Sequence, residues 1–393
     1  MRAASRQDSS QHERLGRLKI ALCLAFATAL LLSPKLWIST RTYPLAPVVG
    51  GIGAIPYPLD YAIFFALFAL VVTAAIVSRP RPYLIGALAI TVGLAIQDQS
   101  RWQPWLYQYL ALLAALAAYS WQPGDPGGSR RALDISRAVM IGLYFWSGVQ
   151  KINATFLTTG LGAVVDAGAV PDPIWALLVQ LGFIVPSAEI AIALGLLTRR
   201  FRDAAAVTAV LVHAFVLIAI GPLGQSWNFI VWPWNVAMAA FSVILFYGDE
   251  TSGPRDILAL ARPRATLHTL VVVLFCLAPA LSFAGLWDSY LSAALYSRNV
   301  RQAGIKVSEA VVERLPAAVA QHVDEQHLLW PMDWSFAEMN VPVYPEPRVF
   351  KAVARAICEY GREPDDVFLV LASRPEILTG TREISSFRCA DLR

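Results

Sequence analysis

The chain has 393 residues, of which 56% are hydrophobic and only 15% are charged, and its formal net charge is +4. Soluble globular proteins carry about 25% charged residues, so much of this protein's surface is expected to face lipid. The arginines are spread over short polar segments and form no single basic face, which argues against a nucleic-acid partner.

Apolar runs of membrane-spanning length recur over the first three quarters of the chain. A helix needs about 20 mostly apolar residues to cross a bilayer. The sequence therefore predicts an all-α polytopic membrane protein with about nine transmembrane helices. No small-residue cleavage site follows the first run, so the first helix is expected to be retained. The nine helices are expected at residues 19–38, 60–78, 83–97, 105–121, 134–153, 174–197, 203–220, 228–247 and 265–285.

Basic residues indicate the orientation of these helices. Arginines cluster in alternate loops, and the N-terminal segment is also basic. Because lysine and arginine are enriched in short cytoplasmic loops, we expect a cytoplasmic N-terminal tail at residues 1–18 and a C-terminus outside the cell inner membrane. The loop arginines are Arg79, Arg81, Arg130, Arg131, Arg199, Arg200, Arg202, Arg255, Arg262 and Arg264.

The chain changes character after the last apolar run, so residues 19–287 are expected to form the membrane domain and residues 288–393 a small domain of its own. Val367–Ala372 is typical of a buried strand, and Lys351–Tyr360 of an amphipathic helix. We expect a small α/β or irregular extracytoplasmic domain. Cys358 and Cys389 would be able to pair in an oxidising compartment, but the sequence leaves their pairing open.

Polar residues inside membrane helices are the main functional candidates, because they are costly in lipid and usually face a protein interior. Tyr144, Ser147, Gly148 and Lys151 follow helical spacing and share one face. Gly148 allows a helix or ligand to approach closely. Either Lys151 is a functional group on this polar face, or it extends to the outer headgroups.

Two further polar residues lie within predicted helices. Glu189 requires a partner or a proton in such a setting. His213 lies near the middle of the following helix. For each, a structural ion pair or hydrogen bond is the alternative to a catalytic role.

Asn228 and Trp232 begin a later helix within an aromatic-rich segment. The segment is either an interfacial aromatic belt or the wall of a pocket for a flat apolar ligand such as a quinone. The chain has no HExxH, CxxC, P-loop or GxSxG motif, and no metal site is predicted.

Three segments carry a resemblance to a known family. The run Tyr144–Phe156 resembles the helix that holds the active-site lysine in vitamin K-dependent γ-carboxylases and related HTTM membrane proteins. Lys151 falls on that family's base. Asp98–Trp102, with Tyr107–Tyr109 after it, resembles the segment entering the preceding helix, and His213 falls on a helix that carries a histidine.

Residues 134–220 also resemble DoxX/MauE-like four-helix proteins, through Gly148, Lys151, Glu189 and Gly195–Arg199. Together the resemblances cover about residues 95–250. They depart from the carboxylase at Trp105, where the carboxylase has a histidine that supports its chemistry. The long lumenal region that binds the carboxylase's protein substrate is also replaced here by about 100 residues.

The carboxylase resemblance implies a quinol-dependent epoxidase or carboxylase-like enzyme in the bilayer. Lys151 would be the base, with Glu189 or His213 as its partner. A quinone or hydroquinone would be the cofactor, with no metal. The MauE-like resemblance implies instead a non-catalytic scaffold or maturation factor for a redox or secreted extracytoplasmic protein partner. A transporter is a third hypothesis. The residues expected to contact the quinone are Tyr144, Ser147, Gly148, Asn228 and Trp232.

Overall fold

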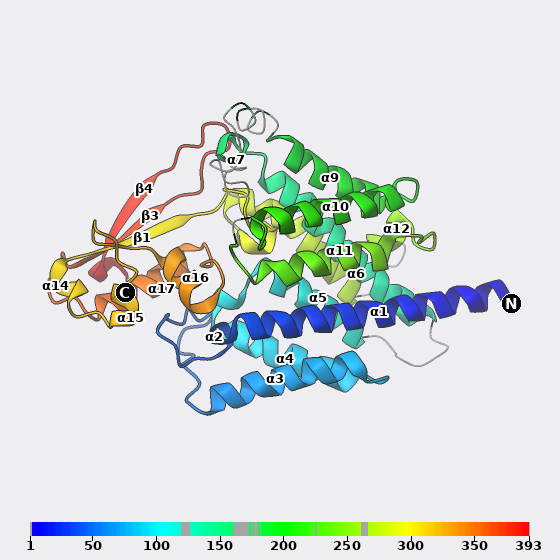
Figure 1. Ribbon diagram of the computed structural model, residues 1–393, viewed down its shortest axis with the longest axis horizontal. Helices are drawn as coiled ribbons and strands as arrows, with labels where there is room; N and C mark the ends of the chain where they lie inside the picture. Colours follow the sequence, from blue (N-terminus) through cyan, green and yellow to red (C-terminus); the bar gives the residue numbers. More distant parts are fainter. Residues whose placement is uncertain are drawn as a thin grey trace.

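A computed structural model of the chain describes residues 2–118, 126–159, 173, 176, 180, 182–224, 226–260 and 266–392. A helical part comes first, and a part built around a β-sheet follows it at one end (Figure 1). The longer helices of the first part run roughly along one common direction. Its elements are α1 (Arg2–Leu32), α2 (Pro34–Trp37), α3 (Leu59–Ile76), α4 (Arg81–Gln97), α5 (Pro104–Ala118), α6 (Pro126–Gln150), α7 (Ala154–Thr159), α9 (Ile184–Leu197), α10 (Arg202–Ile220), α11 (Val231–Phe246), α12 (Pro254–Ile257) and α13 (Thr266–Val272).

Helical turns of other geometry continue α13 as η4 (Val273–Leu277) and η5 (Ala278–Ala284), so one apolar helical segment runs over Thr266–Ala284. Three-residue turns, η1 (Gln99–Arg101) and η6 (Tyr290–Ser292), occupy the connections before α5 and after the last helix. Both connections lie on the side of the helical part that faces the sheet.

Four helices among the described residues are long and apolar enough to cross a membrane, which does not support the expected count of nine. Four further apolar helices, α4, α5, α9 and α11, contain 17, 15, 14 and 16 residues and fall short of a full span. α6 has 25 residues, but its first half carries several charges. The four long segments are Ser10–Leu32, Leu59–Ile76, Arg202–Ile220 and Thr266–Ala284.

The first helix begins much earlier than the sequence predicted. Residues 2–18, expected as a tail, belong to α1, and the side chains of Leu15 and Leu18 are buried against the rest of the protein. The helix ends at Leu32 because Pro34 has no backbone N–H to continue the hydrogen-bond ladder and instead opens α2.

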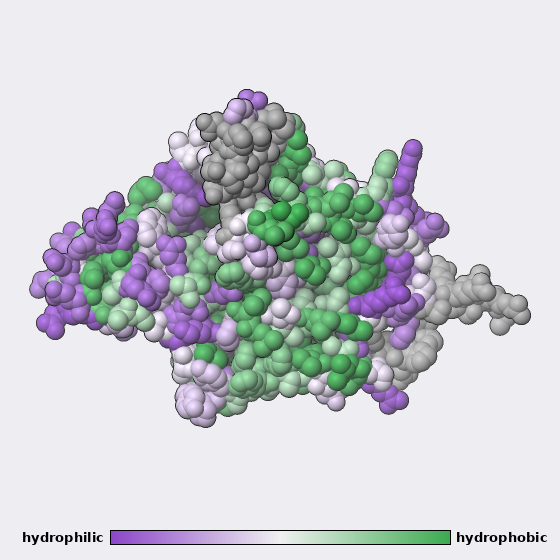
Figure 2. All heavy atoms as spheres, viewed as in Figure 1, coloured by the Kyte–Doolittle hydropathy of each residue, from purple (hydrophilic) through white to green (hydrophobic). Residues whose placement is uncertain are grey.

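Apolar side chains are exposed over the middle of the molecule, while polar ones gather at its two ends (Figure 2). Phe65, Ile76 and Leu211 are examples, with exposed fractions of 61%, 79% and 64%. Large exposed apolar surfaces of this kind mark contact with lipid or protein. The belt therefore agrees with a membrane-embedded helical part.

The C-terminal part is a four-stranded antiparallel sheet in the order β2-β1-β3-β4. Gln302 pairs with Ala372 and Val307 with Val367, which fixes the register of β1 and β3. The predicted strand at Val367–Ala372 is confirmed. The elements of this part are β1 (Gln302–Val307), α14 (Glu309–Val312), α15 (Ala317–Ala320), β2 (Leu328–Leu329), α16 (Pro331–Met339), α17 (Pro347–Cys358), β3 (Val367–Ala372), β4 (Ile384–Arg388) and η7 (Cys389–Leu392).

Helix α17 covers the sheet with an apolar face and confirms the predicted amphipathic helix, although it begins four residues earlier. Its buried residues follow helical spacing because every third or fourth side chain points inward. A disulfide joins Cys358, at the end of α17, to Cys389 directly after β4, with Cα atoms 5.8 Å apart. The buried side chains of α17 are Val349, Phe350, Val353, Ala354 and Ile357.

Buried carboxylates attach the sheet to the adjacent end of the helical part. Glu338 accepts hydrogen bonds from the backbone N–H groups of Thr42 and Tyr43, at 2.7 and 2.9 Å. Glu346 accepts one from the backbone N–H of Ser289 at 2.8 Å and forms an ion pair with Arg301 at 2.7 Å. These contacts fix the sheet against the helices.

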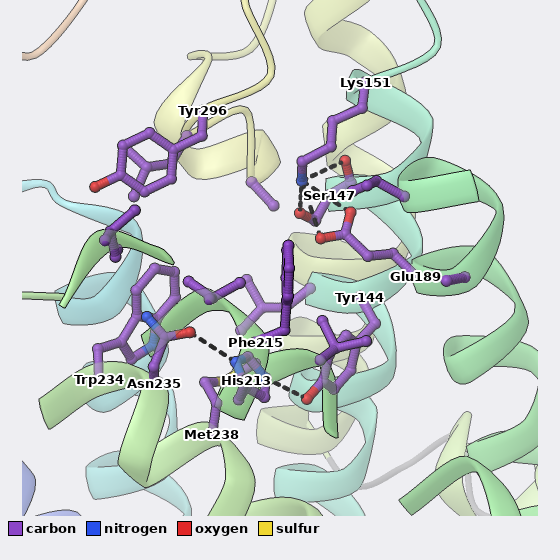
Figure 3. Close-up of a pocket in the computed structure, with 18 of the residues that line it drawn as sticks. Tyr144, Ser147, Lys151, Glu189, His213, Phe215, Trp234, Asn235, Met238 and Tyr296 are labelled. Atoms are coloured by element: carbon purple, nitrogen blue, oxygen red, sulfur yellow. Dashed lines mark hydrogen bonds and ion pairs between the residues drawn. The ribbon is translucent and has the colours of Figure 1, made fainter. Parts of the chain in front are cut away.

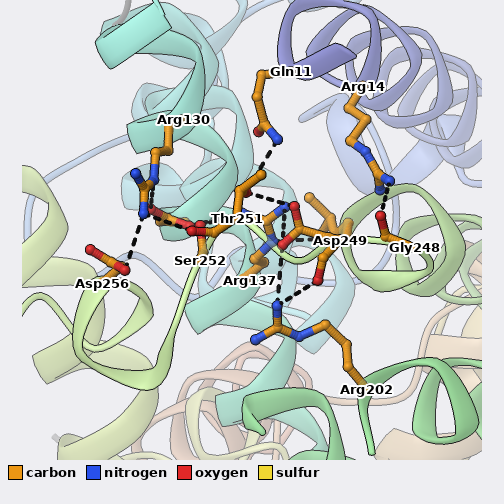
Figure 4. Close-up of polar contacts among 12 residues, drawn as sticks. Gln11, Arg14, Arg130, Arg137, Arg202, Gly248, Asp249, Thr251, Ser252 and Asp256 are labelled. Atoms are coloured by element: carbon orange, nitrogen blue, oxygen red, sulfur yellow. Dashed lines mark hydrogen bonds and ion pairs between the residues drawn. The ribbon is translucent and has the colours of Figure 1, made fainter. Parts of the chain in front are cut away.

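A cluster of arginines occupies the opposite end of the helical part (Figure 4). Asp249 lies 3.1 Å from Arg137 of α6 and 3.2 Å from Arg202 of α10, and all three side chains are buried. Arg14 of α1 donates to the carbonyl of Tyr247 at 2.9 Å. The cluster thus joins α1, α6, α10 and the segment after α11.

Candidate functional site

A cavity of about 500 Å³ lies between α6, α9, α10 and α11, near the end of the helical part that faces the sheet (Figure 3). Most of its lining is apolar, which suits a hydrophobic ligand. The described polar side chains in its wall come from α6 and the residue that follows it, from α9, α10 and α11, and from the segment before β1. They are Tyr144, Ser147, Lys151, Glu189, Thr208, His213, Asn235 and Tyr296.

Lys151 and Glu189 form an ion pair in this wall. The ammonium nitrogen of Lys151 lies 2.8 and 3.0 Å from the two carboxylate oxygens of Glu189. It also donates to the hydroxyl of Ser147 at 2.6 Å and lies 3.2 Å from the Ser147 carbonyl oxygen. The two charged side chains are 8% and 15% exposed, so water screens the electrostatic attraction between them only weakly.

Gly148 explains how the two charges reach each other. A Cβ atom at this position would lie 2.7 Å from both the Pro186 carbonyl oxygen and the Ile190 side chain. The absence of that atom allows α6 and α9 to pack closely, one turn before Lys151. Pro186 lies in the first turn of α9, where a missing N–H costs no helical hydrogen bond.

A second polar group runs from α6 through α10 to α11. Nδ1 of His213 lies 2.8 Å from the side-chain oxygen of Asn235, and Nε2 lies 2.6 Å from the Tyr144 hydroxyl. Because the amide oxygen only accepts, Nδ1 carries the proton and Nε2 accepts from Tyr144. Asn235 in turn donates to the Val231 carbonyl at 2.8 Å. These hydrogen bonds hold the imidazole in one orientation.

The wall formed by α9 and α10 carries exposed apolar side chains. Ile184, Leu211 and Phe215 line the cavity and are nonetheless 48%, 64% and 50% exposed. They belong to the same apolar belt as the outer surfaces of these helices. An apolar molecule on the outer surface of α9 and α10 would therefore lie next to the cavity wall.

The predicted site residues divide into two groups. Lys151, Glu189, His213, Tyr144 and Ser147 all line the cavity, so the structure brings together residues from three predicted helices. Whether they perform catalysis stays a prediction.

The other predicted contacts of a quinone have different surroundings. Gly148 packs against α9 as described. Asn228 donates a hydrogen bond to the hydroxyl of Tyr296, and Trp232 donates to the carbonyls of Ile220 and Trp227 at 3.2 and 3.1 Å. The side-chain N–H groups of Asn228 and Trp232 thus bind the segments around the cavity, and none of the three residues belongs to the described lining.

Trp105, which stands where the carboxylase has a histidine, is buried in the core beside the cavity. Its ring packs against Trp37 and Tyr109, with centroid separations of 6.3 and 5.8 Å. The preceding residue, Pro104, does line the cavity. The indole therefore contributes packing between α2 and α5.

Several lining residues were not predicted as site residues. Trp234 lies on α11, and Ala293 and Tyr296 lie in the connection between η5 and β1. The last two adopt left-handed backbone conformations, with φ of 56° and 59°. One partial signal was present along the chain, because Asn235 shares a helix face with Asn228. No local pattern indicates that residues 293–296 fold over the cavity.

Comparisons with known proteins found no matching family model, curated protein or solved structure. The chemistry of the site therefore follows from its geometry alone. An apolar cavity with a buried ion pair and a separate neutral hydrogen-bond chain is able to hold a hydrophobic ligand by polar atoms and to exchange a proton with it.

Proposed function

We propose that the chain is a multi-pass protein of the cell inner membrane, with a cytoplasmic N-terminus and the sheet on the outer side. In this arrangement the five helices beyond the four long ones, α4, α5, α6, α9 and α11, also cross the bilayer. The arginine cluster around Asp249 supports the orientation, because basic residues favour the cytoplasmic side. The disulfide at the opposite end supports an oxidising compartment there.

For the activity, we propose a quinol-dependent enzyme in which Lys151 is the base, as the γ-carboxylase resemblance implies. The observation that carries this proposal is the Lys151–Glu189 pair inside an apolar cavity of about 500 Å³. A hydroquinone combines a flat apolar ring with two hydroxyl groups. It therefore matches a cavity that is apolar apart from two polar groups.

The role of each group follows from its contacts. Glu189 is able to take a proton from the ammonium of Lys151, which leaves a neutral amine at the cavity wall. That amine accepts the proton of a hydroquinone hydroxyl. Tyr144, fixed by its hydrogen bond with His213, is placed to orient the ligand. The surrounding apolar residues exclude water and so strengthen these interactions.

The oxidant in the proposed reaction is dioxygen. One oxygen atom is added to the ring to give the quinone epoxide, and the other leaves as water with the two hydroxyl protons of the hydroquinone. The two electron pairs needed to reduce O2 come from the hydroquinone and from the ring double bond that becomes the epoxide. Lys151 and Glu189 carry protons and are regenerated.

The test uses membranes that contain the wild type, Lys151→Ala or a control, Lys306→Ala, which removes an exposed lysine on β1. Reduced naphthoquinone and O2 are supplied, and quinone epoxide is measured by mass spectrometry. We expect epoxide from the wild type and from Lys306→Ala, with about a 100-fold loss or more in Lys151→Ala. Equal epoxide formation by Lys151→Ala would contradict the assignment.

A non-catalytic scaffold or maturation factor is the second candidate. The observation that favours it is that Lys151 already contacts Ser147 and both oxygens of Glu189, as a purely structural ion pair does. This candidate predicts no epoxide from any variant and a protein partner that co-purifies from mild detergent. An isolated monomer with quinol-dependent activity would eliminate it.

A further inference from the structure

The connection between β3 and β4, residues 373–383, ends in an apolar tip that packs against no apolar surface of its own sheet. Leu378 is 85% exposed and Ile377 is 43% exposed. Ile384, at the start of β4, is 64% exposed. Adjacent exposed aliphatic side chains of this size mark a contact surface.

The tip is fixed beside the end of α6. The backbone N–H of Ala154, at the start of α7, donates to the carbonyl of Ile377 at 2.8 Å. Figure 1 shows the β3–β4 connection reaching away from the rest of the sheet toward α7. The tip therefore lies at the level where the helical part meets the sheet.

Gly380 makes the close approach to α7 possible. Its φ is +74°, and a Cβ atom there would lie 2.9 Å from the hydroxyl of Thr155. The base of the connection is held too, because Arg374 donates to the hydroxyl of Ser289 at 2.8 Å and also to the carbonyl of Ser282. The connection is anchored at its base and at its tip.

Hydrogen bonds within the turn close its two sides around the tip. The backbone N–H groups of Glu376 and Gly380 donate to the carbonyls of Thr381 and Glu376, each at 2.9 Å. The Glu376 carboxylate accepts hydrogen bonds from the hydroxyls of Thr379 and Thr381, at 2.5 and 3.2 Å.

Exposed apolar side chains continue from the tip onto the end of the last helical segment. Leu281, Phe283 and Leu286 are 47%, 43% and 72% exposed, and Arg374 binds the carbonyl of Ser282 among them. This end of the segment is the outer end in the proposed orientation. The base of the connection thus lies beside exposed apolar side chains at this end of the helical part.

We propose that the tip of the β3–β4 connection, Ile377 and Leu378, inserts into the outer leaflet of the bilayer that surrounds the helices. The inference rests on the proposed membrane placement of the helical part. Lipid is the occupant because the tip exposes two aliphatic side chains and is held, through Ala154, at the outer end of the helical part. The sheet is then tied to the bilayer as well as to the helices, directly beside the segment that follows Lys151.

The experiment places a nitroxide spin label at single cysteines in protein that retains the Cys358–Cys389 disulfide and carries Cys23→Ala and Cys276→Ala. The labelled variants are Leu378→Cys at the tip, Phe65→Cys in the middle of α3, and Asp365→Cys on the exposed surface before β3. Thr379→Cys is a second tip position. Each protein is reconstituted in phosphatidylcholine–phosphatidylglycerol bilayers, and collision rates with O2 and with a water-soluble nickel chelate are compared.

We expect the labels at residues 378 and 379 to collide more often with O2 than with the nickel chelate, as the label at residue 65 does, while the label at residue 365 shows the reverse. If the tip labels behave like residue 365 while residue 65 lies in lipid, the tip inference alone is overturned. If residue 65 also prefers the nickel chelate, the membrane placement fails and the tip inference fails with it.

Discussion

The side-chain nitrogen of Lys151 lies 2.8 Å from a carboxylate oxygen of Glu189, a residue 38 positions further along the chain. The contact joins the end of α6 to the middle of α9. Opposite charges in a poorly hydrated wall hold each other in place, yet either one alone would be costly there. The pair is therefore both a structural link and the group most suited to proton exchange.

Stability and activity are separable at this pair. Lys151→Met leaves the Glu189 carboxylate without its partner, so we expect a loss of about 3–5 kcal/mol in the free energy of unfolding. The double variant Lys151→Met/Glu189→Leu removes both charges and is expected to recover most of that loss without recovering epoxide formation. Thermal unfolding in detergent and the epoxide assay measure the two effects. Recovery of activity in the double variant would show that neither charge acts in the chemistry.

Gly148 sets the distance between α6 and α9. We expect Gly148→Ala to destabilise the protein by about 1–3 kcal/mol, because its methyl group would overlap Ile190 and the carbonyl of Pro186. The matched control is Gly93→Ala in α4, where nothing lies within 4 Å of the added atom. Since alanine favours a helix over glycine, the control is expected to be neutral or slightly stabilising. Equal loss in both variants would contradict close packing at Gly148.

The disulfide should stabilise the C-terminal sheet. It closes a loop with a sequence separation of 31, so replacing both Cys358 and Cys389 by serine is expected to cost about 2–4 kcal/mol. Hydrogen exchange should rise first in β3 and β4, which this bond ties to α17. The control, Cys276→Ala, leaves the disulfide intact and should leave exchange in the sheet unchanged. If hydrogen exchange in the sheet does not rise when Cys358 and Cys389 are both replaced, its hydrophobic core alone stabilises it.

Asp366 makes the stability of the C-terminal sheet domain depend on pH in the acid range. The hydroxyl of Ser308, 2.6 Å away, and the backbone N–H groups of Arg362 and Glu363 lower the pKa of Asp366 to about 2. An unfolded aspartate has a pKa of about 3.9. Because the folded value is the lower one, the stabilisation is complete above about pH 4 and is lost as the pH falls toward 2.

The measurement is the unfolding midpoint of the sheet domain in the intact protein between pH 5 and pH 2. Asp366→Asn should unfold more easily at pH 5 and show a weaker dependence on pH over this range. An unchanged slope in the variant would assign the acid sensitivity to other carboxylates.

The sequence predicted the parts of the fold that depend on local pattern. The apolar runs placed α3, α4 and α10 within two residues at each end, and the strand at Val367–Ala372 was correct at both ends. The lengths of some helices were less predictable. α1 extends back to Arg2 because Leu15 and Leu18 find partners in the bundle, a tertiary contact that hydropathy alone does not reveal. The predicted helix at 174–197 falls partly outside the described residues.

Some residues of the site were predictable from the sequence, but their contacts with one another were not. Lys151, Glu189 and His213 stood out because polar groups are rare in apolar helices, and all three line the cavity. Their partners were not predictable, since the contact of His213 with Tyr144 and Asn235 depends on how three helices pack. Asn228 and Trp232 looked equivalent to Asn235 along the sequence, but their polar atoms bind neighbouring segments instead.

The shared aspartate at the arginine-rich end has a consequence for how the protein is made. Arg137 and Arg202 both precede Asp249 in the chain, Arg202 by 47 residues. During synthesis from the N-terminus, both cations are made before Asp249, although Asp134, which also contacts Arg137 at 2.8 Å, precedes them. The link that Asp249 makes between Arg137 of α6 and Arg202 of α10 therefore forms only after the residues that follow α11 have been translated.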